Sequence, residues 1–329
     1  MTFRLAPHLN PKLFASDIES VANRMGFGIG LLEAGEKNSK IVALSADLTE
    51  STRIIDFKEK FPDRFVEMGI GEQSMASVAS GMSAMGKIPF IASYAMFSPG
   101  RSWEQVRTTI AYNDSNVKVI GAHAGISVGP DGATHQAIED VALMRVIPRM
   151  RVIAPADTLE AKRATHTIAE SVGPAYMRLT RENTPVVTTE ASPFVLGKAE
   201  TYLFRDETHT KKVGIIASGV ILYEAMLAGK ILNEKGIGAS VMNLATIKPL
   251  DTEAVLAFAR EHGAIITVEE HQRVGGMGSA VAEFLSLEHP TQVIRLGVDD
   301  MFGESGTVTE LWKHFGMDAA AIVAEAEKI

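Results

Sequence analysis

Residues 64–75 of the sequence read RFVEMGIGEQSM, which is a short apolar run, two glycines and the start of a helical pattern. The apolar run predicts a buried strand, Gly69 and Gly71 allow a tight turn, and Glu72 begins a helix made of small residues and Met. A strand that leads directly into a helix is typical of a parallel βαβ unit. This stretch therefore predicts an α/β fold.

The same alternation of strands and helices continues on both sides of this stretch. In the first part, strands are expected at residues 41–44, 64–68, 88–92, 117–122, 151–153 and 175–178, and helices at 73–85, 102–112 and 159–171. The pattern restarts with strands at 213–217, 239–242, 264–268 and 292–296, an antiparallel edge strand at 199–203, and helices at 222–233, 251–261 and 279–287. The sequence thus predicts two doubly wound α/β domains.

A segment rich in Thr, Ser and Pro at 184–194 separates the two patterns. We expect an N-terminal tail at 1–16, a first domain at 17–183, this segment as the linker, and a smaller second domain at 195–329.

Composition excludes several classes of protein. The chain has 329 residues with 32 Lys and Arg against 40 Asp and Glu, a net charge of −8, which argues against a nucleic-acid partner. No cysteine is present, so disulfides and thiolate metal sites are excluded. No apolar run approaches the ~20 residues of a membrane span, and the first residues lack a secretory signal. We expect a soluble, cytoplasmic protein.

Ligands of open α/β sheets bind where strands end and helices begin. Four such junctions carry polar or glycine-rich sequence, at residues 45–51, 68–75, 93–101 and 123–135. In the second junction, Glu72 is placed at a helix start and among apolar neighbours. A carboxylate there either shares a proton with a ligand or only caps the free N–H groups of the helix. The residues alone leave both readings open.

The fourth junction, HAGISVGPDGATH at 123–135, contains two histidines, an acid and three glycines. His123 and His135 suit proton transfer or phosphate contact near neutral pH. The alternative is that His135 caps the next helix and Asp131 only makes the turn. A metal site of Asp131, His135 and Glu139 is disfavoured because no third imidazole supports it. We expect no metal site in this chain.

Four motifs together resemble the C-terminal half of transketolase: ALSADLTES at 43–51, MGIGEQSM at 68–75, SVGPDGATHQAIEDVALMR at 127–145 and LTREN at 179–183. The resemblance covers the chain from about residue 17 to its end. It implies the pyrimidine-binding domain of thiamine diphosphate enzymes, followed by a smaller transketolase C-terminal domain.

The resemblance also implies roles at the cofactor. Glu72 matches the glutamate that hydrogen-bonds the ring nitrogen of the aminopyrimidine and promotes proton transfer within the cofactor. Tyr94 and Phe97 match aromatic positions that stack against the pyrimidine ring, and Asp47 is expected to help shape the cofactor pocket.

Other matches concern the sugar. Asp131 and His135 match catalytic residues that contact the sugar C1 and C2 oxygens. The expected sugar-phosphate contacts are His123, Arg181, Arg24 and Ser51. The two arginines have an alternative role in ordinary surface ion pairs.

Two departures qualify the resemblance. Gly100 replaces an expected aromatic residue, and Arg101 in GRSWEQVR is similar to 1-deoxyxylulose-5-phosphate synthase, which adds Arg101 to the expected substrate-binding residues. His123 instead favours transketolase, because the synthase has an aspartate there.

The second departure is the absence of a GDG motif, which in this group holds Mg²⁺ and diphosphate. The resemblance then implies a split enzyme in which a partner N-terminal subunit carries that motif. We expect an α2β2 heterotetramer that transfers a two-carbon ketol unit between sugar phosphates with thiamine diphosphate and Mg²⁺. The alternatives are a synthase-like carboligase subunit and a non-catalytic scaffold subunit.

Overall fold

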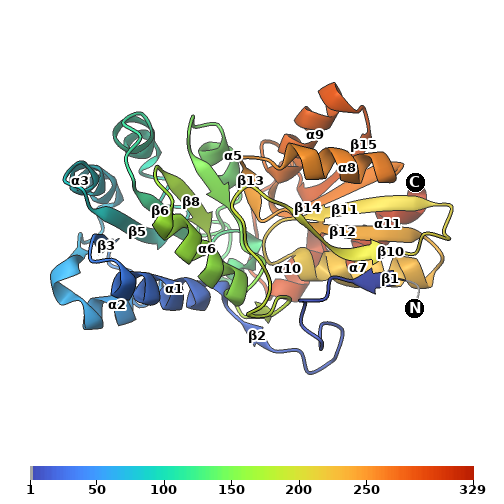
Figure 1. The fold of residues 1–329 in the computed structure, drawn as a ribbon, viewed down its shortest axis with the longest axis horizontal. Helices are drawn as coiled ribbons and strands as arrows, with labels where there is room; N and C mark the ends of the chain where they lie inside the picture. Colours follow the sequence, from blue (N-terminus) through green and yellow to red (C-terminus); the bar gives the residue numbers. More distant parts are fainter. Residues whose placement is uncertain (1–2) are drawn as a thin grey trace.

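Two open β-sheets, each covered by helices on both faces, organise the computed structural model, which describes residues 3–329 (Figure 1). The predicted fold class is confirmed: both sheets are mainly parallel, and the strands alternate with helices along the chain.

The first sheet has seven strands in the order β13-β7-β8-β6-β5-β3-β4. Their bounds are β3 (Ile41–Ser45), β4 (Phe65–Glu67), β5 (Ile88–Tyr94), β6 (Lys118–Ala122), β7 (Arg151–Ile153), β8 (Ala175–Arg178) and β13 (Thr246–Lys248). All neighbours are parallel except the pair β13 and β7. The six strands predicted for the first domain are present, with ends that differ by at most two residues.

Helices cover both faces of this sheet (Figure 1). One face carries α1 (Asn23–Lys37), α2 (Ile55–Lys60) and α6 (Thr158–Glu170), and the other carries α3 (Glu72–Ala84), α4 (Trp103–Gln105), the π-helical turn Val106–Ala111 and α5 (Asp140–Arg145). Helices α1 and α6 lie very close, because a Cβ on Gly26 would meet the Thr158 carbonyl oxygen at 1.7 Å. Only a glycine fits this approach of two helices.

The second sheet has the order β1-β10-β12-β11-β14-β15. Its strands are β1 (Phe3–Leu5), β10 (Glu200–Arg205), β11 (Lys212–Ala217), β12 (Gly238–Asn243), β14 (Ala264–Gln272) and β15 (Gln292–Val298). β10 is antiparallel to β12, as predicted, but it does not form the edge of the sheet, because β1 pairs with its other side. The expected tail 1–16 therefore contains a strand of the C-terminal sheet.

The second sheet is also covered on both faces. α8 (Thr252–Glu261) and α9 (Met277–Glu288) lie on one face, whereas α7 (Leu222–Glu234), α10 (Val308–His314) and α11 (Ala319–Lys328) belong to the core on the other. The sequence patterns above did not predict α10 and α11. Within residues 3–329, no helix combines the length and the apolar character needed to cross a membrane.

The two domains exchange strands. β13, from the C-terminal half, pairs with β7 of the first sheet, while β1, from the N-terminus, joins the second sheet. A short ribbon of β2 (Ser20–Val21) and β9 (Thr184–Pro185) joins the beginning of the first domain to the expected linker at 184–194. One apolar core runs from α3 through Met144 and Ile247 to Phe258 of α8. The domain junction is therefore packed.

Candidate active site

The carboxyl ends of five parallel strands meet at one edge of the first sheet. β3, β4, β5, β6 and β8 lie side by side in the same direction, so the segments that follow them come together. The junctions at 45–51, 68–75, 93–101 and 123–135 all begin at this edge. This placement agrees with the rule that ligands of such sheets bind beyond the strand ends.

Glu72 is the first residue of α3, and its exposed fraction is 1%. Its carboxylate accepts a hydrogen bond from Arg101 Nη1 at 2.7 Å and a longer one, 3.4 Å, from the Ser93 hydroxyl. The Arg101 side chain is 46% exposed, so Glu72 is a buried anion whose counter-ion is reached by solvent.

Arg101 was predicted to bind substrate, but its guanidinium is directed at Glu72. The guanidinium carbon also lies 4.8 Å from the centroid of the Phe97 ring, within the range of a cation–π contact. Arg101, Glu72 and Phe97 therefore form one contiguous group, built from α3 and from the loop that follows β5.

An aromatic stack forms the neighbouring part of the edge. Tyr94 stacks on His123 with ring centroids 3.9 Å apart, and Phe97 lies nearly parallel to Tyr94 with centroids 6.2 Å apart. His135 lies steeply inclined to both aromatic rings, with centroid distances of 6.2 Å to Tyr94 and 5.8 Å to Phe97. Burial, helped by the positive charges of two nearby arginines, lowers the pKa of His123 to about 3. The buried imidazole of His123 is therefore neutral at physiological pH.

The expected phosphate contacts also gather here. Arg24 Nη1 donates to the Ser51 backbone carbonyl at 2.7 Å, so the hydroxyl of Ser51 is not the contact between them. Arg181 Nη1 pairs with Asp131 Oδ1 at 2.9 Å. Burial lowers the pKa of Arg24, and the positive charges of Arg53 and Arg181 lower it further.

Asp47 follows β3 at the same edge, but its side chain is exposed. Its backbone N–H donates to Glu67 Oε1 at 2.7 Å, and the Gly69 N–H donates to the same oxygen at 3.0 Å. The backbone of the 45–51 turn is thus tied to the end of β4. The structure gives Asp47 no side-chain contact with Glu72.

The loop 123–135 differs from the prediction in one respect. The helix expected directly after His135 begins at Asp140, so His135 does not cap it. Instead, His135 Nδ1 lies 2.9 Å from the Thr134 hydroxyl. Asp140 is buried and receives hydrogen bonds from Arg178 and from the Tyr176 hydroxyl, at 2.6 Å for the latter.

Sequence reasoning assigned no role to Ser93, Asp140, Arg178 or Tyr176. Ser93 lies at the end of β5, within the predicted junction at 93–101, and this position alone could have indicated that it belongs to the site. The contact between Asp140 and Arg178 joins residues 38 positions apart, and no local pattern indicates it. Within residues 3–329, no group of three or more His, Cys, Asp or Glu side chains is arranged to hold a metal ion.

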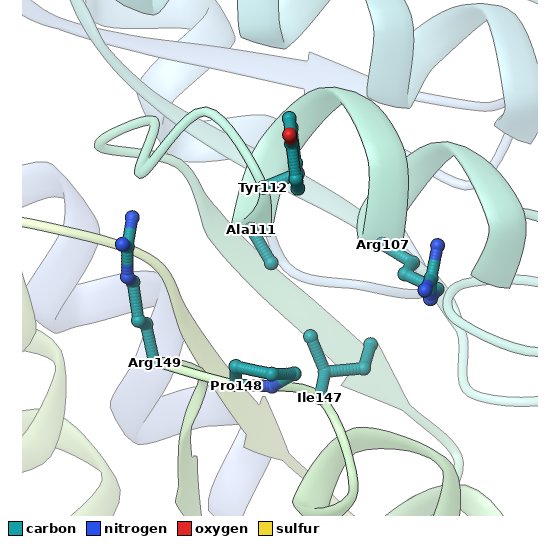
Figure 2. Close-up of a pocket in the computed structure, with 6 residues that line it drawn as sticks. All are labelled: Arg107, Ala111, Tyr112, Ile147, Pro148 and Arg149. Carbon is teal, nitrogen blue, oxygen red and sulfur yellow. The ribbon is translucent and has the colours of Figure 1, made fainter.

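A separate cavity of about 440 Å³ lies away from Glu72, between the π-helical turn Val106–Ala111 and the loop that follows α5 (Figure 2). Its lining consists of Arg107, Ala111, Tyr112, Ile147, Pro148 and Arg149. Figure 2 shows the two arginines on opposite sides of the apolar Pro148 and Ile147. The cavity contains none of the predicted site residues.

Two family models match the chain in succession. Residues 19–187 match the transketolase pyrimidine-binding domain, and residues 204–322 match the transketolase C-terminal domain. The order of the two domains agrees with the prediction from the motifs.

Individual relatives extend this likeness over most of the chain. A putative transketolase C-terminal section from Methanocaldococcus jannaschii is 42% identical over 302 residues, covering 91% of this chain and 93% of the relative. A 6-deoxy-6-sulfo-D-fructose transketolase subunit from Clostridium sp. is 41% identical over 299 residues, covering 91% of each chain. A solved structure described as a split gene transketolase, inactive beta4 tetramer, is 44% identical with a TM-score of 0.85; the match covers 94% of this chain and 98% of that one.

Proposed function

The chain belongs to the transketolase family, and from this premise we propose that it is the C-terminal subunit of a split transketolase. With its partner it transfers a two-carbon ketol unit from a ketose phosphate to an aldose phosphate, using thiamine diphosphate. The observation that carries this proposal is the buried carboxylate of Glu72 at the carboxyl edge of the sheet, paired with an Arg101 guanidinium that lies over the Phe97 ring.

The residues present fit the pyrimidine end of this cofactor. Glu72 offers a buried acceptor for a ring N–H, and Phe97 and Tyr94 offer flat apolar faces. When bound, the cofactor supplies the covalent chemistry that cleaves and re-forms the carbon–carbon bond of the sugar. Glu72 holds or releases the proton at the ring nitrogen, and Asp47 lies at the adjacent strand end to shape the pocket.

The remaining residues bind the sugar. His135 and Asp131 contact the C1 and C2 oxygens, where His135 presents its Nε2 because Nδ1 contacts Thr134. Arg24 and Arg181 attract the phosphate, for which an arginine offers a fork of N–H donors. His123 is a neutral imidazole and contributes a hydrogen bond rather than a charge.

Contacts between neighbouring residues define the roles of Ser51 and of the pair Arg181–Asp131. Ser51 contributes through the loop that its carbonyl fixes on Arg24. The pair Arg181–Asp131 has both side chains about one-third exposed, so it opens at small cost when a phosphate enters.

Mg²⁺ and the diphosphate are held mainly by the partner N-terminal subunit, because this sequence has no GDG motif. We place the contact between subunits on the exposed side of α3, which carries Ser74, Ser77, Val78, Gly81 and Ala84. Small side chains let another backbone approach closely. The complex is an α2β2 heterotetramer in the cytoplasm, and the chain without its partner is inactive. The described inactive state of the related beta4 tetramer supports this last point.

The test is to isolate this chain at natural abundance and identify the polypeptides that accompany it by mass spectrometry. A chain that bears GDG together with thiamine diphosphate supports the proposal. Assays then compare ketose phosphates, a 6-deoxy-6-sulfo ketose and pyruvate as donors. Activity with pyruvate alone identifies a synthase-like carboligase, and a complex with no activity on any donor identifies a scaffold.

A further inference from the structure

Arg101 makes two contacts that the proposed function gives to the aminopyrimidine of the cofactor. Its Nη1 donates to Glu72 Oε2 at 2.7 Å, and its guanidinium carbon lies 4.8 Å from the Phe97 ring centroid. A guanidinium is flat, delocalised and rich in N–H donors, and it stacks on aromatic faces. It therefore resembles a protonated nitrogen heterocycle in both shape and hydrogen bonding.

We propose that Arg101 occupies the pyrimidine position in the chain without cofactor and leaves it when the cofactor binds. This inference rests on the proposed function, because it takes Glu72 and Phe97 as the residues that receive the pyrimidine ring. It changes the role of Arg101 from a substrate contact to a residue that competes with the cofactor.

The exposure of the partners supports this exchange. Glu72 is 1% exposed, and a buried carboxylate that loses its counter-ion is strongly destabilised. The Arg101 side chain is 46% exposed, so its guanidinium returns to water without a large desolvation cost. Arg101 thus satisfies Glu72 while the chain lacks cofactor, and an incoming ring with its own N–H donor replaces it.

Competition of this kind reduces the apparent affinity for the cofactor, because only the molecules in which Arg101 has left Glu72 can bind it. Removing the guanidinium should therefore strengthen cofactor binding. The opposite role, in which Arg101 stays on Glu72 and positions it for the bound cofactor, predicts weaker binding. Whether cofactor affinity rises or falls therefore distinguishes the two roles.

The experiment uses the complex of this chain with its partner and thiamine diphosphate as the probe. Calorimetry measures the cofactor Kd for wild type, Arg101→Met, Arg101→Lys and the control Arg107→Met. Arg107 is exposed on the following turn and lines the separate cavity. Methionine retains much of the side-chain length without charge, whereas lysine retains charge without the flat donor group.

We expect the Kd of Arg101→Met to be about two- to tenfold lower than that of wild type, with Arg101→Lys between them and Arg107→Met unchanged. Without cofactor, Arg101→Met should unfold at a lower temperature, and the increase on adding cofactor should be larger than in wild type. If Arg101→Met binds equally or more weakly, the inference is wrong. A wild-type complex that binds no thiamine diphosphate overturns the proposed function as well.

Discussion

Glu72 and Glu160 are two glutamates in the first turn of a helix, and each is almost completely buried. The two carboxylates differ in the groups that donate hydrogen bonds to them. Glu160 accepts hydrogen bonds from the Ala156 N–H at 2.6 Å and from Asn243 Nδ2 at 2.8 Å, and both donors are buried in the same chain. Glu72 depends on Arg101, which is half exposed.

The difference is between a carboxylate enclosed by buried groups and one whose ion-pair partner is reached by solvent. Asn243 belongs to β12 of the second sheet, so Glu160 holds the two domains together. Burial, and then the charge of Asp157, raises the pKa of Glu160 to about 7. At the strand edge, the partner of Glu72 is in contact with solvent. Burial alone therefore does not distinguish the two carboxylates; the exposure of the partner does.

The substitution with the largest expected effect tests whether Glu72, unlike Glu160, acts on a ligand. Glu72→Gln should lower kcat of the assembled complex about 10²–10⁴-fold, because it removes the group that exchanges a proton. Glu160→Gln is the matched control and should keep most of the activity. Steady-state kinetics with a ketose phosphate measures both. Equal activities of the two variants would contradict a difference in role between Glu72 and Glu160.

A third buried carboxylate, that of Asp140, resembles Glu160 in that groups of the same chain bind it. Asp140 receives two hydrogen bonds from Arg178, at 2.9 and 3.0 Å, and one from Tyr176. Asp140→Ala leaves the buried Arg178 guanidinium without its anion and should reduce the free energy of unfolding by about 3–5 kcal/mol. Urea unfolding of the chain at pH 7 measures this loss. A loss below about 1 kcal/mol would show that Arg178 finds another partner.

Glu160 itself should make stability depend on pH. Its pKa of about 7 in the folded chain lies above the usual 4.5, so the folded state binds more protons than the unfolded state between these values. The free energy of unfolding should therefore fall as pH rises from about 4.5 to about 7, by up to about 3 kcal/mol.

Glu160→Gln should flatten this slope and be more stable than wild type above pH 7. The Oδ1 atom of Asn243 is buried and without a partner, so an amide at position 160 has an acceptor once the Asn243 amide turns over. Urea titrations at pH 5, 6, 7 and 8 measure the slope. A slope that is unchanged in the variant assigns the pH dependence to other groups.

The smallest expected effect concerns the partly exposed pair Arg181–Asp131. Asp131→Asn should change the free energy of unfolding by less than about 1 kcal/mol, because solvent screens this pair. Activity should nevertheless fall if Asp131 contacts the sugar. A thermal melt and a rate measurement on the same preparation separate stability from activity. A large loss of stability would show that Asp131, like Asp140, has a structural role.

Local signals in the sequence were sufficient for the parallel strands and their polar ends. The segment around Glu72 combines an apolar run, glycines and a helix start within twelve residues, and each is a short-range preference. β1 and β13 were missed because each lies outside the alternation of strands and helices and is stabilised by antiparallel pairing with a strand far away in the sequence.

The same limit applies to the site. The residue types at the strand ends were predictable, but the contact between Arg101 and Glu72 spans 29 positions. The motif suggested a substrate contact for Arg101. Which partner a long, flexible arginine side chain selects depends on burial and on neighbouring rings, and these are properties of the folded chain.

The exchanged strands β1 and β13 affect how the chain can be divided. A fragment that ends in the segment 184–194 keeps β7 but loses β13, and the complementary fragment keeps β10 but loses β1. Each fragment then has an unprotected sheet edge, which is prone to pair with other molecules. Such truncations should dimerise by domain swapping or aggregate, and the intact chain should melt in a single calorimetric transition.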